Sequence, residues 1–126
     1  MVSVDLRFRT SARWELGWFD VLPADALTPG RGVAALVAGR QIAIFLLPGG
    51  ELYAVDNHDP FSGANVMSRG IVGDRDGVPK VASPMYKQSF DLRTGRCLDD
   101  ETVGLTTYPV KISDGVVVVD VEDVEP

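Results

Sequence analysis

The sequence contains very little sulfur and imidazole: one cysteine, Cys97, and one histidine, His58, in 126 residues. A single cysteine cannot form an internal disulfide, so nothing indicates a disulfide-stapled secreted domain. A zinc or hard-metal site would need His58 together with Asp56 or Asp59 and a further, distant ligand. An exposed loop histidine is the simpler interpretation, and we expect no metal site in this chain.

Long apolar runs and a basic leader are missing as well. The longest apolar candidate, Gln41 to Pro48, has the length of a strand and is too short for a membrane span. Near the N-terminus, Asp5, Arg7 and Arg9 interrupt the apolar stretch that a signal peptide requires. We therefore expect no membrane partner and a cytoplasmic location.

The charge of the chain is predominantly negative. A formal net charge of −6 disfavours a nucleic-acid partner, because the phosphate backbone would be repelled. Between residues 69 and 96 the balance reverses to +3, since six basic residues stand against three acidic ones. This segment is either a solvated loop region of mixed charge or a docking surface, and both interpretations stay open. If it is a docking surface, the candidate contacts are Arg69, Lys87 and Arg93.

Hydrophobic residues make up 45% of the chain and charged residues 24%, which is the balance of a globular domain. We expect a single domain over residues 1–126, with a possible flexible arm at 1–13, a loop-bearing subdomain at 57–98 and a frayed acidic tail at 122–126. The sequence shows eight or nine short strand-like runs and no convincing amphipathic helix. This pattern predicts an all-β sandwich or barrel. The expected strands are 14–21, 32–38, 41–47, 51–56, 81–82, 89–92, 96–98, 108–112 and 116–121, and 57–80 is expected to be rich in loops.

Three turns indicate hairpins in this pattern. Pro48-Gly49-Gly50 connects two strand-like runs, as does Arg93-Thr94-Gly95. Ser113-Asp114-Gly115 connects the last two expected strands and contains an Asp-Gly pair, which is a strong hairpin signal.

Two short loops dominate the middle of the chain, and each follows a strand-like run. They are Asn57-His58-Asp59-Pro60-Phe61-Ser62-Gly63 and Ser83-Pro84-Met85-Tyr86-Lys87-Gln88-Ser89-Phe90-Asp91. The pair resembles the cluster-binding loops of Rieske iron–sulfur domains, whose patterns are N-x-C-P-H-x-G and C-P-x-H-G-x-x-F-D. The resemblance implies an all-β Rieske-like fold, with a β-sandwich base and a smaller loop-bearing subdomain.

The four positions at which that family places its metal ligands hold other residues here, namely Asp59, Phe61, Ser83 and Tyr86. A Rieske [2Fe–2S] centre needs two thiolates and two imidazoles, which one cysteine and one histidine cannot supply. This excludes an electron-transfer ferredoxin. We expect the Phe61 and Tyr86 rings to fill the space between the loops by packing, and Asp59 to cap loop N–H groups.

A more specific resemblance covers residues 53–57, 59–66, 68–73, 82–88, 90, 92–98 and 107–110, with His58 as a departure from the family pattern. These segments look like the small subunit of NADH-dependent assimilatory nitrite reductase, a cluster-less Rieske-fold family. The resemblance implies a cofactor-free subunit in nitrogen metabolism. Its large partner would carry flavin (FAD), an iron–sulfur cluster and sirohaem and would reduce nitrite to ammonia. The alternative is a stand-alone Rieske-fold interaction module without redox activity.

No catalytic or nucleotide-binding residues are expected in this chain. A pair of His58 with Ser62 or Ser83 is conceivable, but the G-x-S-x-G pattern of a nucleophile elbow is missing. The glycines at 49–50 and 70–73 make neither a phosphate loop nor a dinucleotide fingerprint. Cys97 is most simply a small core residue.

Overall fold

The computed structural model describes residues 2–4 and 17–121, and these form eleven strands and two short 3₁₀ helices. The strands are β1 (Val2–Val4), β2 (Trp18–Pro23), β3 (Gly32–Val37), β4 (Arg40–Leu46), β5 (Leu52–Asp56), β6 (Ile71–Arg75), β7 (Val78–Ala82), β8 (Ser89–Asp91), β9 (Thr107–Tyr108), β10 (Val110–Ser113) and β11 (Val116–Asp120). The 3₁₀ helices are η2 (Ala24–Ala26) and η3 (Met67–Arg69). The expectation of an all-β fold is confirmed.

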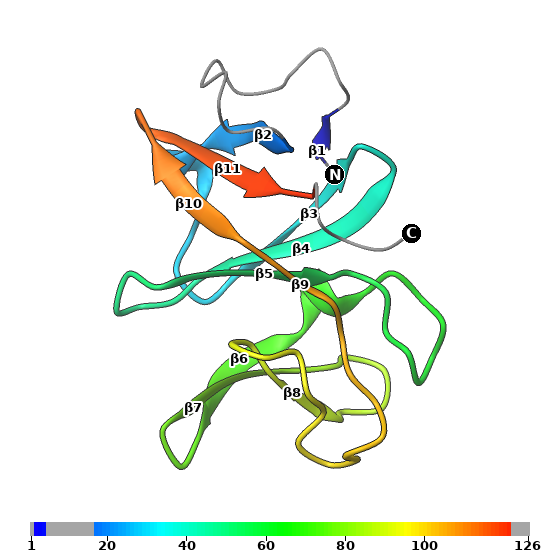
Figure 1. The fold of residues 1–126 in the computed structure, drawn as a ribbon. Coiled ribbons are helices and arrows are strands. Elements are labelled where there is room, and N and C mark those ends of the chain that lie inside the picture. The colour runs from blue at the N-terminus through cyan, green and yellow to red at the C-terminus, as the bar shows by residue number, and fades with distance from the viewer. Residues whose placement is uncertain (1, 5–16, 122–126) are drawn as a thin grey trace.

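The strands form three sheets. A five-stranded sheet has the order β1-β3-β4-β5-β9, and two three-stranded sheets have the orders β10-β11-β2 and β6-β7-β8. Neighbouring strands are antiparallel except β1 and β3, which pair in parallel. Figure 1 shows the five-stranded sheet across the middle, the β10-β11-β2 sheet above it and the small β6-β7-β8 sheet below.

Strand β4 lies at the centre of this arrangement. Ile42, Ala43, Ile44 and Phe45 are fully buried, because the strand is covered on both of its faces. Side chains alternate along a strand, so Ile42 and Ile44 enter the core shared with the β10-β11-β2 sheet. Ala43 and Phe45 enter a second core, which the small sheet completes with Val81 and Phe90 among others. One strand therefore joins both cores.

Two of the expected hairpins occur as the turns indicate. β4 pairs with β5 around residues 48–50, and β10 pairs with β11 around Asp114 and Gly115, which both have positive φ. The third expected hairpin, around residues 93–95, is reduced to an isolated bridge between Phe90 and Cys97, so the expected strand at 96–98 does not form.

The interpretation of residues 57–80 as loop-rich is wrong for its second half. β6 and β7 form a regular hairpin there, and its turn residues Asp76 and Gly77 have φ of 52° and 85°. The sequence pattern does not predict strand β6, because its side chains are mostly exposed and so lack an alternation of apolar and polar residues. With this hairpin the described strands outnumber the eight or nine expected.

The ends of the chain fall only in part within the description. The expected arm at 1–13 contributes β1, which pairs with β3, while residues 1 and 5–13 lie outside the described residues. The expected strand at 14–21 appears as β2, shifted toward the C-terminus, and residues 14–16 are not described. The expected tail at 122–126 also lies outside the described residues. In the described part of the chain, no helix has the length and apolar character that a membrane span requires.

Candidate functional site

The first loop follows β5 and is anchored by Asn57, which is buried. The Asn57 Oδ1 atom accepts a hydrogen bond from the Ser68 N–H at 2.8 Å, and Nδ2 donates to the Asn65 carbonyl at 3.2 Å. These bonds tie the start of the loop to its far side and to helix η3. The retained Asn therefore fixes the path of the chain around the tip of the loop.

Asp59 is fully buried at the centre of a hydrogen-bond cluster. Its Oδ1 atom accepts the Phe61 N–H at 3.0 Å. Its Oδ2 atom accepts the hydroxyls of Ser62 at 2.9 Å and of Ser83 at 2.5 Å. The expectation that Asp59 caps a loop N–H is confirmed, and the bond from Ser83 also reaches across to the second loop.

The second loop connects β7 and β8 and closes tightly on itself. The Ser83 N–H donates to the Gln88 carbonyl at 2.9 Å, and the Lys87 N–H donates to the Ser83 carbonyl at 3.0 Å. The Ser83 hydroxyl also accepts the Met85 N–H at 3.2 Å. Lys87 has a φ of 66°, in the left-handed region that non-glycine residues seldom adopt. The loop thus has one defined shape, set by Ser83.

The direct bond between Asp59 and Ser83 joins the two positions at which the Rieske pattern has its cysteines. Burial by itself raises the pKa of Asp59, but hydrogen bonds from Ser83, the Phe61 N–H and Ser62 more than offset this, so the pKa of that carboxyl lies below its usual range. The buried group is therefore a carboxylate at neutral pH, and its charge is held by these donors.

The two aromatic rings at the former histidine positions have different surroundings. Phe61 is half-buried and packs against Phe90, with ring centroids 6.1 Å apart. Tyr86 is 61% exposed, so the expectation that it fills the space between the loops is wrong. The closed loop leaves Tyr86 exposed to solvent, which a sequence pattern alone does not reveal.

A Rieske cluster does not fit these residues. The Asp59 carboxylate is already engaged by three donors, Phe61 offers no donor atom, and Tyr86 faces solvent. Cys97 lies buried in the second core, while His58 is exposed and its Nδ1 atom lies 3.3 Å from Oδ1 of Asn65. Among the described residues, no three His, Cys, Asp or Glu side chains are placed to hold a metal ion.

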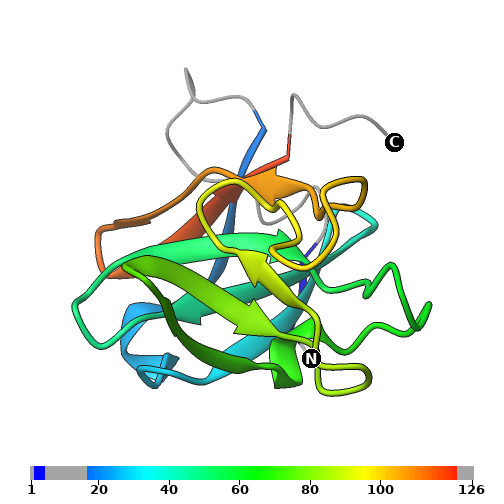
Figure 2. The ribbon, with the colours of Figure 1, turned by 90° about the horizontal axis from the view of Figure 1, so that it is seen from below.

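The structure separates the three candidate docking cations. Arg69 and Lys87 are exposed, one at the end of η3 and the other in the second loop. Both loops project on the same side of the molecule when it is viewed from below (Figure 2). Arg93 follows β8, whereas Lys87 precedes it, so the two lie toward opposite ends of that strand.

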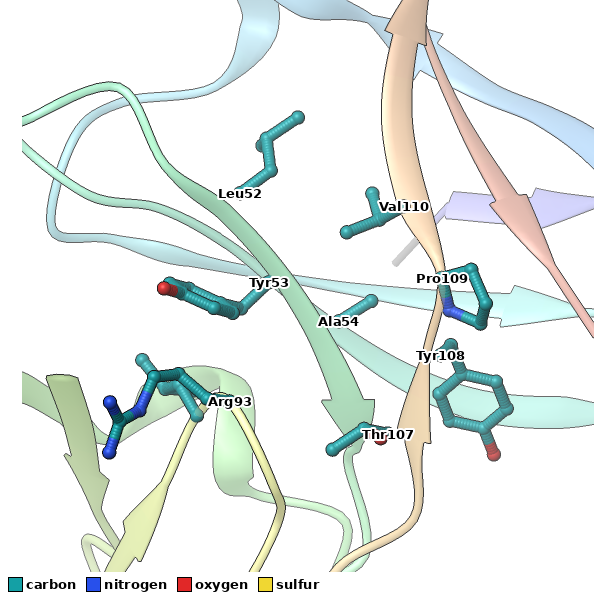
Figure 3. Close-up of a pocket in the computed structure, with 9 residues that line it drawn as sticks. Leu52, Tyr53, Ala54, Arg93, Thr107, Tyr108, Pro109 and Val110 are labelled. Carbon is teal, nitrogen blue, oxygen red and sulfur yellow. The ribbon is translucent and has the colours of Figure 1, made fainter. Parts of the chain in front are cut away.

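Arg93 instead lines a cleft of about 340 Å³ between β5, β9 and the chain that leads into β10. Figure 3 shows its guanidinium group on the side of the cleft formed by Tyr53. Its Nε and Nη2 atoms each donate to a carboxylate oxygen of Asp91 at 3.2 Å, which lowers the positive charge available to a partner.

Sequence reasoning missed the exposure of three large apolar side chains near the loops. Ile71, Met85 and Tyr86 are 73%, 52% and 61% exposed. Ile71 faces Ala82 across the β6-β7 ladder, and Ala82 leads directly into the second loop. The available signal was Met85-Tyr86, an apolar pair following a proline inside a loop, where polar residues are the rule.

Comparison with known proteins gives a consistent result. Residues 17–120 match the family model of the Rieske-like [2Fe-2S] domain. The NADH nitrite reductase small subunit of Salmonella typhimurium is 41% identical over 101 residues, which cover 79% of this chain and 94% of that protein. The solution structure of the nitrite reductase [NAD(P)H] small subunit from Erwinia carotovora superposes with a TM-score of 0.73 at 39% identity, covering 87% of this chain and 85% of that one.

A further relative is a longer chain. The nitrite reductase [NAD(P)H] large subunit of Klebsiella oxytoca contains a segment 43% identical to this chain over 98 residues, which cover 78% of this chain and 10% of that protein. A domain similar to this chain is thus covalently part of a large-subunit polypeptide in that organism.

Proposed function

We propose that this chain serves as the small subunit of an NADH-dependent nitrite reductase. The premise is that it belongs to the Rieske-like family and, within that family, to these small subunits. In this role it supports the reduction of nitrite to ammonia by a large subunit and contributes no catalytic residue of its own. It is then a non-catalytic part of an oxidoreductase of nitrogen assimilation.

One observation carries the proposal that this subunit works without a cluster. The Asp59–Ser83 hydrogen bond joins the two loops directly. In a Rieske domain, thiolates and iron would make this connection. Because the carboxylate is buried and held by several donors, these hydrogen bonds support the shape of the loops without requiring a metal. The retained loop shape is therefore available for a purpose other than electron transfer.

The partner follows from the relatives. The Klebsiella chain, in which a similar domain is joined to a large subunit, supports association of the two, since a covalent link raises their effective concentration. FAD, an iron–sulfur cluster and sirohaem belong to the proposed large subunit, which also sets the choice between NADH and NADPH. We place the complex in the cytoplasm.

The proposed organisation is a single domain over residues 1–126 with a loop-bearing subdomain at 57–98. That subdomain contains both loops, η3 and the small sheet. It is the part of the chain through which we propose that the partner is contacted.

Reconstitution with the large subunit tests this function. The purified large subunit of the same organism would be assayed for NADH-dependent formation of ammonia from nitrite, with and without this chain. We expect the two proteins to co-purify and the activity or the stability of the complex to rise on addition of the small subunit. A protein that neither binds the large subunit nor changes its activity or stability would instead be a stand-alone interaction module.

A further inference from the structure

We propose that the surface formed by Arg69, Ile71, Met85, Tyr86 and Lys87, here named the tip patch, binds the large subunit at an apolar depression rimmed by carboxylates. This inference rests on the proposed function and specifies the surface and the chemistry through which it operates.

The members of the tip patch lie at one end of the small sheet. Ile71 begins β6 and stands opposite Ala82, the last residue of β7. Met85, Tyr86 and Lys87 follow within the loop that Ala82 enters. Arg69 ends η3, and Gly70, next to it, packs so closely on the Ala82 carbonyl and Val81 that a side chain there would collide with both. The end of η3 is thereby held against the end of β7, from which the second loop starts.

Most of the large hydrophobic side chains that the described residues expose belong to the tip patch. Four large hydrophobic side chains are exposed in the described part of the chain, and three of them, Ile71, Met85 and Tyr86, belong to the patch. Contiguous exposed apolar side chains on a soluble protein mark interaction sites, whereas scattered ones need no explanation. Tyrosine and methionine are also enriched at the centres of protein interfaces.

The patch is presented by a rigid support. Ser83, at the base of the loop that carries Met85 and Tyr86, is buried and bonded to Asp59, to the Met85 N–H and to Gln88. A loop already fixed in one conformation loses little entropy when a partner binds it, so its exposed side chains contribute more of their contact energy to affinity. This is the arrangement expected of a preformed docking tip.

The charges of the patch indicate the chemistry of its partner. Among the described residues, no ion pair engages Arg69 or Lys87, whereas Arg75 is paired with Asp99 and Arg93 with Asp91. Two uncompensated cations beside an apolar centre fit a surface that offers carboxylates around a hydrophobic depression. A second copy of this chain fits poorly, because a symmetric contact between two tip patches would bring like charges together.

The test is binding of the full-length chain to the purified large subunit, measured by biolayer interferometry at low and high salt. We expect Tyr86→Ala to raise Kd at least about tenfold, mainly through faster dissociation, as an interfacial aromatic anchor does. We expect Arg69→Glu with Lys87→Glu to slow association at low salt, with a difference that shrinks at high salt.

Two matched controls lie outside the tip patch. Ile112→Ser removes the fourth exposed hydrophobic side chain, on β10, and Asp25→Lys reverses an exposed charge in η2, outside residues 57–98. Both should bind as the unmodified chain does, and the thermal midpoints of all variants should show that they are folded.

The outcomes separate the two proposals. Failure of the unmodified chain to bind the large subunit would overturn the proposed function. Binding that tolerates all the tip variants would overturn the tip patch and leave the function standing. Sedimentation of the chain alone shows whether it self-associates; a dimer that Tyr86→Ala abolishes would assign the patch to a second copy and would also overturn the inference.

Discussion

At the scale of single residues, Asp59 connects the two loops through a charge that is buried and hydrogen-bonded. An unfolded aspartate has a pKa of about 3.9, and the folded value of Asp59 lies lower. A group of this kind contributes stability that is complete above the unfolded pKa and is lost as the pH falls through the folded pKa.

We therefore expect Asp59→Asn to lower the free energy of unfolding by about 1–3 kcal/mol at neutral pH, because one charged acceptor of three hydrogen bonds is lost. The variant should also lose less stability than the unmodified protein as the pH falls below about 5, since the protonation of Asp59 that weakens the unmodified protein in that range is absent. Urea denaturation at several pH values measures both effects.

The carboxyls of Asp91, Asp99 and Asp100 also have lowered pKa values, so only the difference between the two proteins reports Asp59. Glu101→Gln, at an exposed position, is the control for the loss of one carboxylate. Equal acid dependence of Asp59→Asn and the unmodified protein would contradict the role assigned to the buried carboxylate.

The residue scale also shows the limit of a sequence pattern. The pattern placed Asp59 and Ser83 at corresponding positions of two loops, and the type of Asp59 was sufficient to predict that it caps a loop N–H group. Its bond to the Ser83 hydroxyl was not predicted. The different exposure of Phe61 and Tyr86 was not predictable from the sequence. The exposure of a loop side chain depends on the hydrogen bonds that close the loop, such as the one from the Lys87 N–H to the Ser83 carbonyl.

At the scale of elements, the turn that follows β8 depends on Gly95. Its φ is 81°, and a Cβ atom there would collide with the Leu105 carbonyl. Gly95→Ala should lower the free energy of unfolding by about 2–4 kcal/mol, since backbone strain and steric overlap add.

Gly77 provides a matched comparison in the β6-β7 turn. Its φ is 85°, but no atom lies within 4 Å of an added Cβ. Gly77→Ala should cost only about 1–2 kcal/mol, the conformational term alone. Thermal or urea unfolding of the pair measures the difference, and equal losses would show that the Leu105 contact is relieved by movement of the chain.

Some strands can be predicted from the sequence more readily than others. β4 and β11 are apolar runs next to clear turn residues, so the apolar pattern and the turn signals together predict them. The β6-β7 hairpin carries its Asp76-Gly77 turn signal, but its outer strand is exposed and holds charged side chains. An apolar pattern cannot reveal a strand that contributes little to the core.

At the scale of the whole molecule, β4 and β5 supply side chains to both cores. Neither core can be lost without exposing one face of the five-stranded sheet. We therefore expect the base and the loop-bearing part to unfold in a single transition rather than one after the other.

Phe45→Ala tests this coupling. The side chain is fully buried in the second core, and its truncation should cost about 3–5 kcal/mol. Hydrogen exchange at amides of β7 and of β11 should show similar losses of protection, because both sheets depend on β4. Loss confined to β7 would show instead that the small sheet opens independently.

The Asp59–Ser83 bond has a final consequence, for biosynthesis. A protein whose loops are shaped by a cluster cannot complete its fold until iron and sulfide have been delivered to it, since binding and folding are then one event. In this chain the corresponding connection is made by two side chains of its own, so the loops order as soon as the polypeptide is synthesised. We therefore expect the loops to form without an iron supply, so that scarcity of iron leaves the shape of the tip patch unaffected.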